Sequence, residues 1–469
     1  MAKLVQAAPR ATSPSAPQSR PSRVLTVMCA GMFLVLLDVT IVNVALPSVG
    51  HSLRAGIAGL QWVVDGYAVA IASLLLAGGT VGDRLGHRRV LLAGFAVFGL
   101  ASLVCAVAPS VGVLVGGRIA QGIGGALLLP STMAVIADVY PDRARQARAL
   151  GTWAAVSSLA LPAGPLLGGL LVGAASWRLV FWINVPLVAL TLLATWLVVP
   201  SAPGRGSGRF DVRGLLALVV GLAGFVFTVI SAGRGDEIVL TAATGFVTVL
   251  ALAAAWRTER RAAEPVLPID LLRRRDFSSP NLVALTMNLV FNGLLFVLML
   301  YLQDIRGYSP IRAGLAVLPL AVPLVLLAPV SGRLTARRGP RTAIALGCLI
   351  AAPGAALLIG VPTSGGSIGW LLAGFAVLGC GAGLVTASVV AAAVRATPPE
   401  RSGLATGVSN TARQVGTATG VALFGAVAGQ PSDPAGFVRA VHVLAGVATV
   451  LWLLAFAVAL RGVAADDGG

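Results

Sequence analysis

Residues 36–47 read LLDVTIVNVALP, an aliphatic run that contains a single carboxylate, Asp38. A charged side chain in such a run is costly in a bilayer and unusual in a soluble core, so it needs a partner or a function. The rest of the chain identifies the surrounding solvent: its 469 residues are 57% hydrophobic and 11% charged, with a mean hydropathy of +0.91. Apolar stretches of roughly 20 residues recur from end to end, each long enough to cross a bilayer as a helix. The sequence therefore predicts an all-α, multi-pass membrane protein.

The apolar stretches predict fourteen transmembrane helices. They lie at about 24–46, 59–79, 89–108, 111–136, 149–172, 178–198, 213–231, 237–256, 281–303, 310–332, 341–360, 367–394, 403–428 and 438–460. Six precede residue 199 and six follow residue 280, so we expect two six-helix halves with two extra central helices. The expected segments are a disordered cytoplasmic tail (1–23), an N-terminal half (24–198), two additional helices with cytoplasmic linkers (199–280), a C-terminal half (281–460) and a second cytoplasmic tail (461–469).

The basic residues are distributed unevenly between the two sides of the membrane. With the N-terminus inside, 26 of the 34 lysines and arginines fall in cytoplasmic segments and 6 at external ends, while Arg118 and Arg413 lie within spans. The positive-inside rule therefore predicts that both termini are cytoplasmic. The net charge of +17 has the same origin, because these arginines flank membrane spans, where they favour the topology and attract anionic lipid. No nucleic-acid partner is expected.

Several classes of protein lack support in the sequence. The four cysteines, Cys29, Cys105, Cys348 and Cys380, lie in apolar runs without metal spacing, so neither disulfides nor a metal site is expected. A membrane acyl- or glycosyl-transferase should carry paired carboxylates or a His/Asp constellation at the interface, and no such group is evident. Nucleotide-binding motifs are absent too, because the Gly-rich run at 118–126 lies within an apolar helix. We therefore expect no enzyme and no cofactor, with an ion gradient as the energy source.

An internal repeat relates the two halves of the chain, at a distance of about 255 residues. The stretch GTVGDRLGHRR at 79–89 matches GRLTARRGPR at 332–341. The matched pairs are Gly79/Gly332, Arg84/Arg337, Gly86/Gly339 and Arg88/Arg341. Duplicated halves are typical of secondary transporters. Asp83 is matched by Ala336, so the first half keeps a charge that the second has lost.

Five motifs follow one another in an order that resembles the fourteen-span drug:proton antiporters of the major facilitator superfamily. They are LDVTIVNVALP (37–47), GGTVGDRLGHRR (78–89), RIAQGIGGA (118–126), LALPAGPLLGG (159–169) and WRLVFWINVP (177–186). The resemblance implies the major facilitator fold and export of small amphipathic drugs or antibiotics in exchange for protons. It further implies a monomer in a bacterial plasma membrane, with the proton gradient in place of a cofactor. The alternative is a proton-coupled uptake or metabolite carrier of the same fold.

The loop motif between the second and third spans has two interpretations. Its members are Gly79, Gly82, Asp83, Arg84, Gly86 and Arg88. The resemblance implies a gate in which Asp83 meets the N-terminus of the thirteenth span, near Arg401 and Gly403, when the cytoplasmic side is shut. The alternative is a loop that simply sets topology through its positive charge.

The fifth span carries the motif that distinguishes exporters in the family. Its members are Gly164, Pro165, Gly168 and Gly169. Small residues at helical spacing allow backbone contact with a neighbouring helix, and Pro162 with Pro165 removes helix hydrogen bonds and predicts a bend. Tight packing alone would also explain the glycines. The Gly-Pro combination resembles the antiporter motif and disfavours uptake.

The charged residues inside the spans are the candidates for proton coupling. Asp38 lies about 12 Å and Arg118 about 10 Å from the outer membrane face, at 1.5 Å per residue, so the two can pair. A pair that can open would tune the proton affinity of Asp38, which makes it the first candidate for the coupling carboxylate. The alternative is a static ion pair that fixes the first span against the fourth. Asp65, nearer the outer mouth, is the second candidate and could instead face water there.

Two sets of polar residues could line a cargo cavity. They are Asn288 and Asn292 on the ninth span, and Asn410, Arg413 and Gln414 on the thirteenth. Each set follows helical spacing, so it forms a stripe that must face protein or a cavity rather than lipid. Packing between helices is the alternative role. Two aspartates and two arginines leave the interior balanced, so the sequence favours neither cationic nor anionic cargo.

Overall fold

The computed structural model describes residues 21–201, 212–234, 238–260, 269–362, 366–398 and 402–464. Within these ranges the regular structure is helical throughout, without a strand. The helices are α1 (Pro21–Leu53), α2 (Ile57–Leu85), α3 (His87–Ala106), α4 (Val111–Val139), α5 (Arg143–Ser158), α6 (Ala160–Ala174), α7 (Leu179–Trp182), α8 (Asn184–Val198), α9 (Val212–Arg234), α10 (Ile238–Glu259), α11 (Ile269–Leu272), α12 (Arg275–Leu300), η1 (Tyr301–Ile305), α13 (Pro310–Leu357), η2 (Leu358–Gly360), α14 (Gly369–Arg395), α15 (Ser402–Ala428) and α16 (Pro434–Gly462). The expected tails, apart from 21–23 and 461–464, and most of the central linkers lie outside the described residues.

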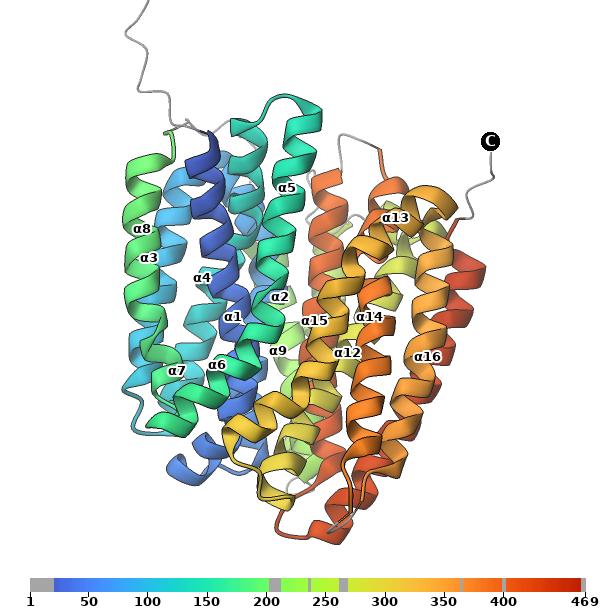
Figure 1. The fold of residues 1–469 in the computed structure, drawn as a ribbon. Coiled ribbons are helices and arrows are strands. Elements are labelled where there is room, and N and C mark those ends of the chain that lie inside the picture. Colours follow the sequence, from blue (N-terminus) through green and yellow to red (C-terminus); the bar gives the residue numbers. More distant parts are fainter. Residues whose placement is uncertain are drawn as a thin grey trace, which may run out of the picture.

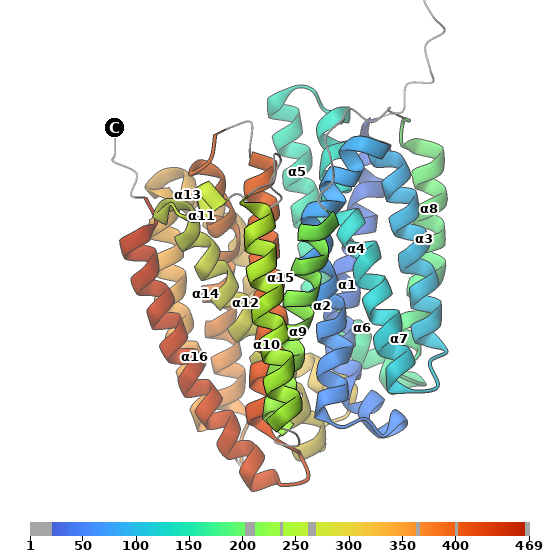
Figure 2. The same ribbon diagram turned by 180° about the vertical axis from the view of Figure 1, so that it is seen from behind.

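The helices gather into two bundles that stand side by side (Figure 1). The first bundle holds α1 to α8 and the second holds α12 to α16, while α9 and α10 lie behind, next to α2 and α15 (Figure 2). The chain enters α1 and leaves α16 at the same end, which we call the terminal end. The distal end is the opposite one, which carries the α1–α2 turn. Helices α9 and α10 are thus additions to a pair of bundles rather than members of either.

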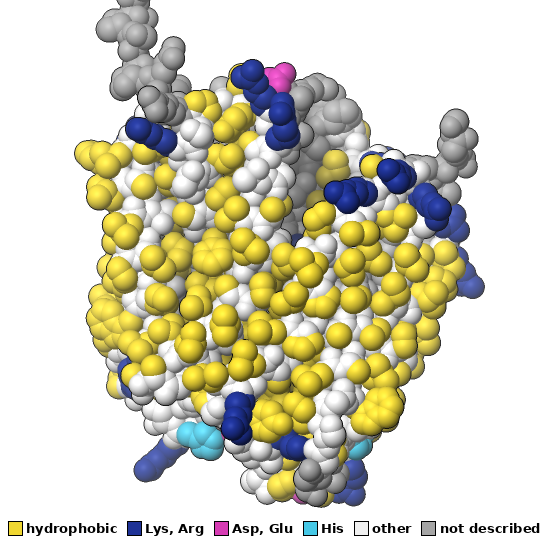
Figure 3. All heavy atoms as spheres, viewed as in Figure 1, with side chains coloured by type: hydrophobic (Ala, Val, Ile, Leu, Met, Phe, Trp, Pro, Cys, Tyr) yellow, Lys and Arg dark blue, Asp and Glu magenta, His cyan; other side chains and the backbone are white. Residues whose placement is uncertain are grey.

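Length and composition make this a multi-pass membrane protein. Eleven helical stretches among the described residues are long and apolar enough to cross a membrane, and a shorter apolar helix, Leu216–Ala232, lies within α9. Arginines gather at the two ends of the molecule, and hydrophobic side chains cover the surface between these ends (Figure 3). A bilayer would cover this apolar surface, since it contains no water to satisfy exposed polar groups.

The repeat inferred from the sequence has a structural counterpart at two glycines. Gly86 ends α2 with φ at 88°, and Gly339 interrupts α13 with φ at 76°. Residues with a side chain rarely adopt such angles, so each chain reversal requires glycine. At Gly339 the 48-residue α13 therefore folds back, and two successive helices share one label.

The fifth apolar stretch contains the break that its prolines predict. Helix α5 ends at Ser158 and α6 begins at Ala160, with Leu159 between them. Pro162 falls in the first turn of α6, where its missing N–H leaves no helix hydrogen bond unmade. The next apolar stretch is also broken, between α7 and α8, so that Asn184 begins a helix.

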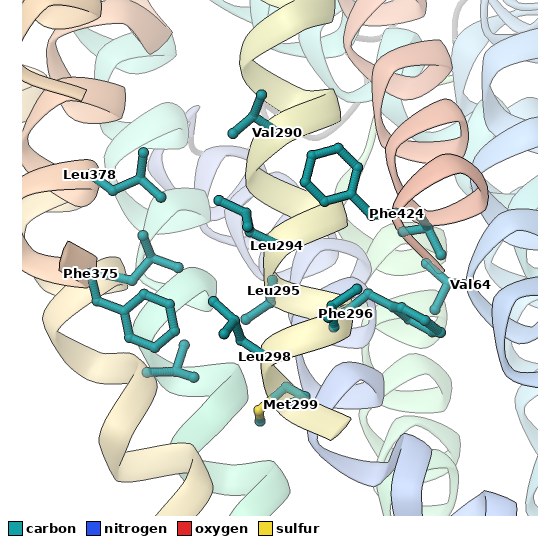
Figure 4. Close-up of a cluster of buried hydrophobic side chains, with 14 of the residues drawn as sticks. Val64, Val290, Leu294, Leu295, Phe296, Leu298, Met299, Phe375, Leu378 and Phe424 are labelled. Carbon is teal, nitrogen blue, oxygen red and sulfur yellow. The ribbon is translucent and has the colours of Figure 1, made fainter. Parts of the chain in front are cut away.

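Among the described residues, the two bundles share hydrophobic cores in the distal and middle parts of the molecule. One cluster of buried side chains joins the distal parts of α1 and α2 to α12, α13 and α15. Figure 4 shows part of it, with Val64 of α2 beside Phe424 of α15 and near Phe296 of α12. A second cluster, which includes Met28 and Leu75, belongs to the first bundle alone and fills its terminal part. The bundles are therefore packed together distally and cored separately near the terminal end.

Hydrogen bonds between the bundles also lie at the distal end. The side-chain amide of Gln61 donates to the carbonyl oxygens of Val421 and Ala422, at 3.2 and 2.8 Å. Gln303 donates to the carbonyl of Val44 at 3.0 Å. These bonds join α1 and α2 to α15 and η1, so they reinforce the shared core.

A polar contact closes the outer rim of this junction. His51 Nε2 lies 3.1 Å from Asp304 Oδ1, across the boundary between the bundles. Beside it is a cavity of about 370 Å³, whose lining includes Gly50, Leu300 and Ser432. At the terminal end, by contrast, the surface is hollowed between α5 and α13 (Figure 3). The molecule is thus closed distally, whereas the described residues leave a hollow between the bundles at the terminal end.

Candidate functional site

Asp38 and Arg118 meet in the interior of the first bundle. Helix α1 brings Asp38 and α4 brings Arg118, whose Nη1 donates to Oδ2 of the carboxylate. Both side chains are buried, with relative exposures of 0% and 1%. The depths read from the sequence therefore place the two groups correctly in contact. In a low-dielectric interior a charge-assisted bond of this kind is strong.

Two amides complete the coordination of Asp38. Asn184, at the start of α8, donates to Oδ1 at 2.7 Å, and Gln121 of α4 donates to the same oxygen at 3.1 Å. Gln121 in turn accepts a bond from Arg118 Nη1 at 2.8 Å and donates to Ser102 at 2.8 Å. Three helices, α1, α4 and α8, thus meet at one carboxylate, and Ser102 joins α3 to them through Gln121.

The guanidinium of Arg118 has further partners. Its Nε donates to the carbonyl of Val63 at 3.0 Å, and its Cζ lies 4.4 Å from the centre of the Tyr67 ring. The tyrosine face adds a cation–π attraction to the ion pair. Asp38 and Arg118 are therefore a satisfied, electrically balanced centre, which we call the paired centre.

Three members of the paired centre are not among the site residues predicted from the sequence: Gln121, Asn184 and Tyr67. Gln121 stands three residues after Arg118, and this spacing places both side chains on one face of α4. Asn184 is an isolated amide in an apolar stretch, which is a signal for a buried polar contact. Nothing in the local sequence marks Tyr67.

Asp65 presents the opposite environment. Its side chain is completely buried, and neither carboxyl oxygen has a hydrogen-bond partner among the described residues. Asp65 lies four residues after Gln61, on the face of α2 that meets α15. An ionised carboxylate without partners in such a place is very costly, so the neutral acid is the favoured form. The expected alternative of a water-facing group at the mouth does not fit this position.

The motif of the fifth span lies between the two bundles. Gly164 and Gly168 pack on α1, where Thr40 also donates to the carbonyl of Ala160 at 3.0 Å. Gly169 faces the other bundle: a Cβ placed there would lie 2.8 Å from the Cα of Ile311 in α13. That is too close for any side chain, so the contact requires glycine.

The same contact is close on the α13 side. A Cβ on Gly314 would collide with the carbonyl oxygen of Pro165. The backbones of α6 and α13 therefore touch across the boundary at the distal end. We call this contact between α6 and α13 the distal seal.

The loop motif makes contacts within its own bundle. Asp83 pairs with His87 four residues later, at 3.2 Å, and Arg88 donates to the carbonyl of Trp196 at 2.5 Å. Gly79 and Gly82 pack near Pro130 and Ser131 of α4, and Arg84 also has a bonded or electrostatic partner. Asp83 bonds to no described residue of the second bundle, and Arg401 lies outside the described residues. In this conformation the expected clasp between the bundles is not formed.

The polar stripes of the second bundle meet in part. Asn292 of α12 donates to Thr417 of α15 at 3.1 Å and to the backbone of Asn288 at 3.0 Å. Asn288 donates to the carbonyl of Ala284 in its own helix. The side chains of Asn410, Arg413 and Gln414 are partly exposed and bond to none of the residues that the structure describes. Asn292 therefore links α12 to α15, whereas the side chains of Asn410, Arg413 and Gln414 make no such link.

Metal chemistry gains no support from this arrangement. Within the described ranges, no three His, Cys, Asp or Glu side chains come together as a metal site would require. The cysteines that the sequence sets apart are separate from one another and unpaired.

Comparison with known proteins agrees with this geometry. The model of the Major Facilitator Superfamily matches residues 28–421 and, in a second match, 322–468. The chain is 36% identical to the methylenomycin A resistance protein of Streptomyces coelicolor, over 87% of this chain and 86% of that protein. It is 35% identical to the tetracenomycin C resistance and export protein of Streptomyces glaucescens, over 88% of this chain and 77% of that one.

More distant and structural relatives agree. The multidrug resistance protein Stp of Mycobacterium tuberculosis is 33% identical over 85% of this chain and 74% of its own length. The crystal structure of a bacterial homologue of the human lysosomal transporter Spinster superposes with a TM-score of 0.70, covering 96% of this chain and 97% of that one, at 16% identity. That likeness concerns the fold. The chain therefore belongs to the major facilitator superfamily and is a transporter related to its drug- and antibiotic-resistance exporters, not an enzyme.

Proposed function

We propose that the protein is a proton-coupled antiporter that exports small amphipathic drugs or antibiotics across a bacterial plasma membrane by alternating access. The observation that carries the proposal is Asp65, a completely buried carboxyl group without a partner at the boundary between the bundles. Such a group is costly unless it carries a proton or has a function. The resistance proteins among the relatives support the cargo class.

The membrane topology in this proposal has fourteen spans with both termini in the cytoplasm. The count takes α13 as two spans joined at Gly339 and includes α9 and the more polar α15. The 26-to-6 distribution of basic residues supports the orientation, which makes the terminal end cytoplasmic. Reporter fusions to the C-terminus test it: an external C-terminus would contradict the topology.

With this orientation the structure corresponds to an inward-facing state. The distal end, now external, is closed by the shared core, the distal seal and the pair of His51 with Asp304. The hollow between α5 and α13 faces the cytoplasm (Figure 3). Alternating access then requires the distal contacts to part while the loop motif closes the other end, where Asp83 can reach the second bundle.

The two buried carboxyl groups have different roles in the proposed cycle. Asp65 carries the exchanged proton, because it is held neutral here and reaches water when α2 and α15 separate. Asp38 remains paired with Arg118 and holds α1, α4 and α8 together. This assignment reverses the priority that the sequence alone suggests, since the paired centre is too fully satisfied to open readily.

Transport by purified protein in liposomes tests the proposal. An imposed pH gradient should drive a fluorescent amphipathic drug against its concentration gradient, and dissipation of the pH gradient by an ionophore should abolish the accumulation. The matched control is Asp65→Asn, which imitates the neutral acid permanently. Accumulation that persists without a pH gradient would contradict proton coupling. A susceptibility panel in an efflux-deficient host, with the protein supplied or absent, then identifies the cargo.

A further inference from the structure

The two parts of α15 differ in their surroundings. Every residue from 416 to 422 is buried, whereas every residue from 412 to 415 is partly exposed. The exposed part lies toward the terminal end, where α15 is visible in the gap between α5 and α13 (Figure 1). The surface is hollowed in the same place (Figure 3). The terminal part of α15 therefore borders the open side of the molecule.

Arg413 lies well inside this region. It follows the first residue of α15, Ser402, by eleven positions, which places it about 16 Å along the helix. It shares a helix face with Gly416 and Thr417, which contact Leu285 and Asn292 of α12. Arg413 thus stands at the edge of the contact between α12 and α15, toward the terminal end.

No protein anion compensates this guanidinium. The side chain of Arg413 has no hydrogen bond or ion pair with any described residue, although its backbone carbonyl accepts a bond from Thr417 at 3.1 Å. The acidic residues that the sequence places inside the apolar spans are Asp38 and Asp65. Asp38 is bound to Arg118, and Asp65 is buried without a hydrogen-bond partner among the described residues. A guanidinium offers five hydrogen-bond donors, and Asn410, one turn earlier on α15, adds an amide. This part of α15 is therefore rich in donors and positively charged.

This charge restricts the kind of cargo that fits. A cation would be repelled by Arg413, because opposite charges are absent nearby. An anion would bind, but its negative charge would oppose the ionisation of Asp65, whereas exchange requires that bound cargo does not hold the proton in place. A neutral molecule with oxygen acceptors satisfies the donors and leaves proton release unopposed.

We propose that Arg413 forms, together with Asn410 and the Asn292–Thr417 pair, a cargo subsite for neutral amphiphiles that present carbonyl oxygens. The subsite rests on the proposed function, since the exclusion of anions follows from the direction of exchange. The second bundle then recognises cargo, while the first bundle and its boundary handle the proton. Carboxylate oxygens offer the same acceptor chemistry, so the experiment must separate them from carbonyls.

Equilibrium binding of three matched probes makes this separation. We suggest the dansyl derivatives of glycine methyl ester, glycine and ethylenediamine, which present a neutral ester, a carboxylate and an ammonium group on one fluorophore. Energy transfer from tryptophan reports binding to the full-length protein in detergent. No gradient is imposed, so failure of proton coupling in liposomes cannot be confused with failure of the subsite.

The wild type should bind the ester about tenfold or more tightly than the ammonium probe and more tightly than the carboxylate. Arg413→Met should weaken ester binding by about tenfold, the worth of a charge-assisted hydrogen bond, and Arg413→Lys should restore part of it. Ammonium binding should improve or stay unchanged in Arg413→Met. The control, Arg312→Met at an exposed distal arginine, should change none of the affinities.

Three outcomes would overturn the subsite. Tightest binding of the carboxylate by the wild type would indicate an anion site instead. Equal weakening of all three probes in Arg413→Met would assign the residue a structural role, as would failure of Arg413→Lys to restore any ester binding. Should Arg413→Met fail to yield a monodisperse protein, Arg413→Gln carries the same test, because it removes the charge and keeps a polar group.

Discussion

Asp38 and Asp65 are equally buried, yet their surroundings are opposite. Asp38 is bound by Arg118, Asn184 and Gln121. Asp65, only two residues after Val63, whose carbonyl accepts from the guanidinium, has no hydrogen-bond partner among the described residues. Burial alone therefore does not determine the charge state of a carboxyl group in this molecule. The partners determine it: one group is stabilised as an anion and the other as a neutral acid.

The comparison also separates structural from exchangeable charge. The paired centre ties α1, α2, α4 and α8 together inside one bundle, so its disruption should affect the fold. Asp65 lies on the boundary between bundles, so the motion that opens the boundary changes its access to water. We therefore expect substitutions in the paired centre to lower the stability of the protein, and substitutions of Asp65 to affect transport.

Arg118→Ala should have the largest effect, because it turns Asp38 into a second carboxyl group without a counter-charge. Breaking a buried pair by removing one partner costs about 3–5 kcal/mol of stability. Thermal unfolding in detergent, followed by gradient-driven transport, measures the loss. Arg118→Lys should retain a fraction of both, since the charge survives but the planar fork does not. An Arg118→Ala protein as stable as the wild type would show that the paired centre is not the structural element described here.

Asp65→Asn should abolish uphill transport with little change in stability. No bond is lost, so the change in the free energy of unfolding should remain within about 1 kcal/mol. Downhill exchange of cargo should continue, because the amide imitates the protonated state. Asp38→Asn is the matched comparison: it should also stop uphill transport, but with a clear loss of stability, because Arg118 would remain buried without its anion. Equal stability losses in the two variants would remove the distinction.

Gly169→Ala should weaken the distal seal and give Asp65 earlier access to water. The added Cβ would lie 2.8 Å from Ile311 Cα, and overpacking of this kind costs about 1–3 kcal/mol. Spin labels at Ser48 and Ser432 should report a larger fraction of long distances across the distal end. Gly112→Ala, where nothing lies within 4 Å of the added atom, is the control. Identical distance distributions in the two variants would show that the seal does not govern the closed state.

His51→Gln should have the smallest effect, because the side chain of His51 is 79% exposed and surface pairs are weak. The imidazole attracts Asp304 fully only when protonated, so external acid should favour the closed distal end in the wild type. Labelling of Ser432→Cys by an impermeant maleimide, in a protein without native cysteines, should therefore slow on acidification by up to about fivefold more than the loss of reactive thiolate alone explains. This additional slowing should disappear in His51→Gln, where only the loss of thiolate remains. A pH response of equal size in the variant would place the sensitivity elsewhere.

Much of the fold could be predicted from apolar length and from repeated glycines. The spans follow from hydropathy, and the repeat indicated both Gly86 and Gly339, where the chain reverses with positive φ. The pairing of Asp38 with Arg118 could be anticipated because the rise of 1.5 Å per residue gives the depth of each residue in the membrane, and the two depths are similar.

The rest depends on which helix each face meets, and sequence spacing does not contain that information. Asn184 reaches Asp38 from a helix almost 150 positions later in the chain. The isolation of Asp65 and the open surroundings of Arg413 likewise arise from packing between bundles. For the same reason Asp83, expected to meet the second bundle, pairs with His87 in this conformation.

Infrared difference spectroscopy tests the contrast between the two carboxyl groups most directly. A protonated carboxylic acid has a carbonyl stretching band that an ionised carboxylate lacks, so the method reports the charge state without reference to transport. At neutral pH the wild type should show one such buried band, which should vanish in Asp65→Asn and remain in Asn184→Ala, a variant that perturbs only the surroundings of Asp38. A band that persists in Asp65→Asn but shifts in Asn184→Ala would place the proton on Asp38 and contradict the account.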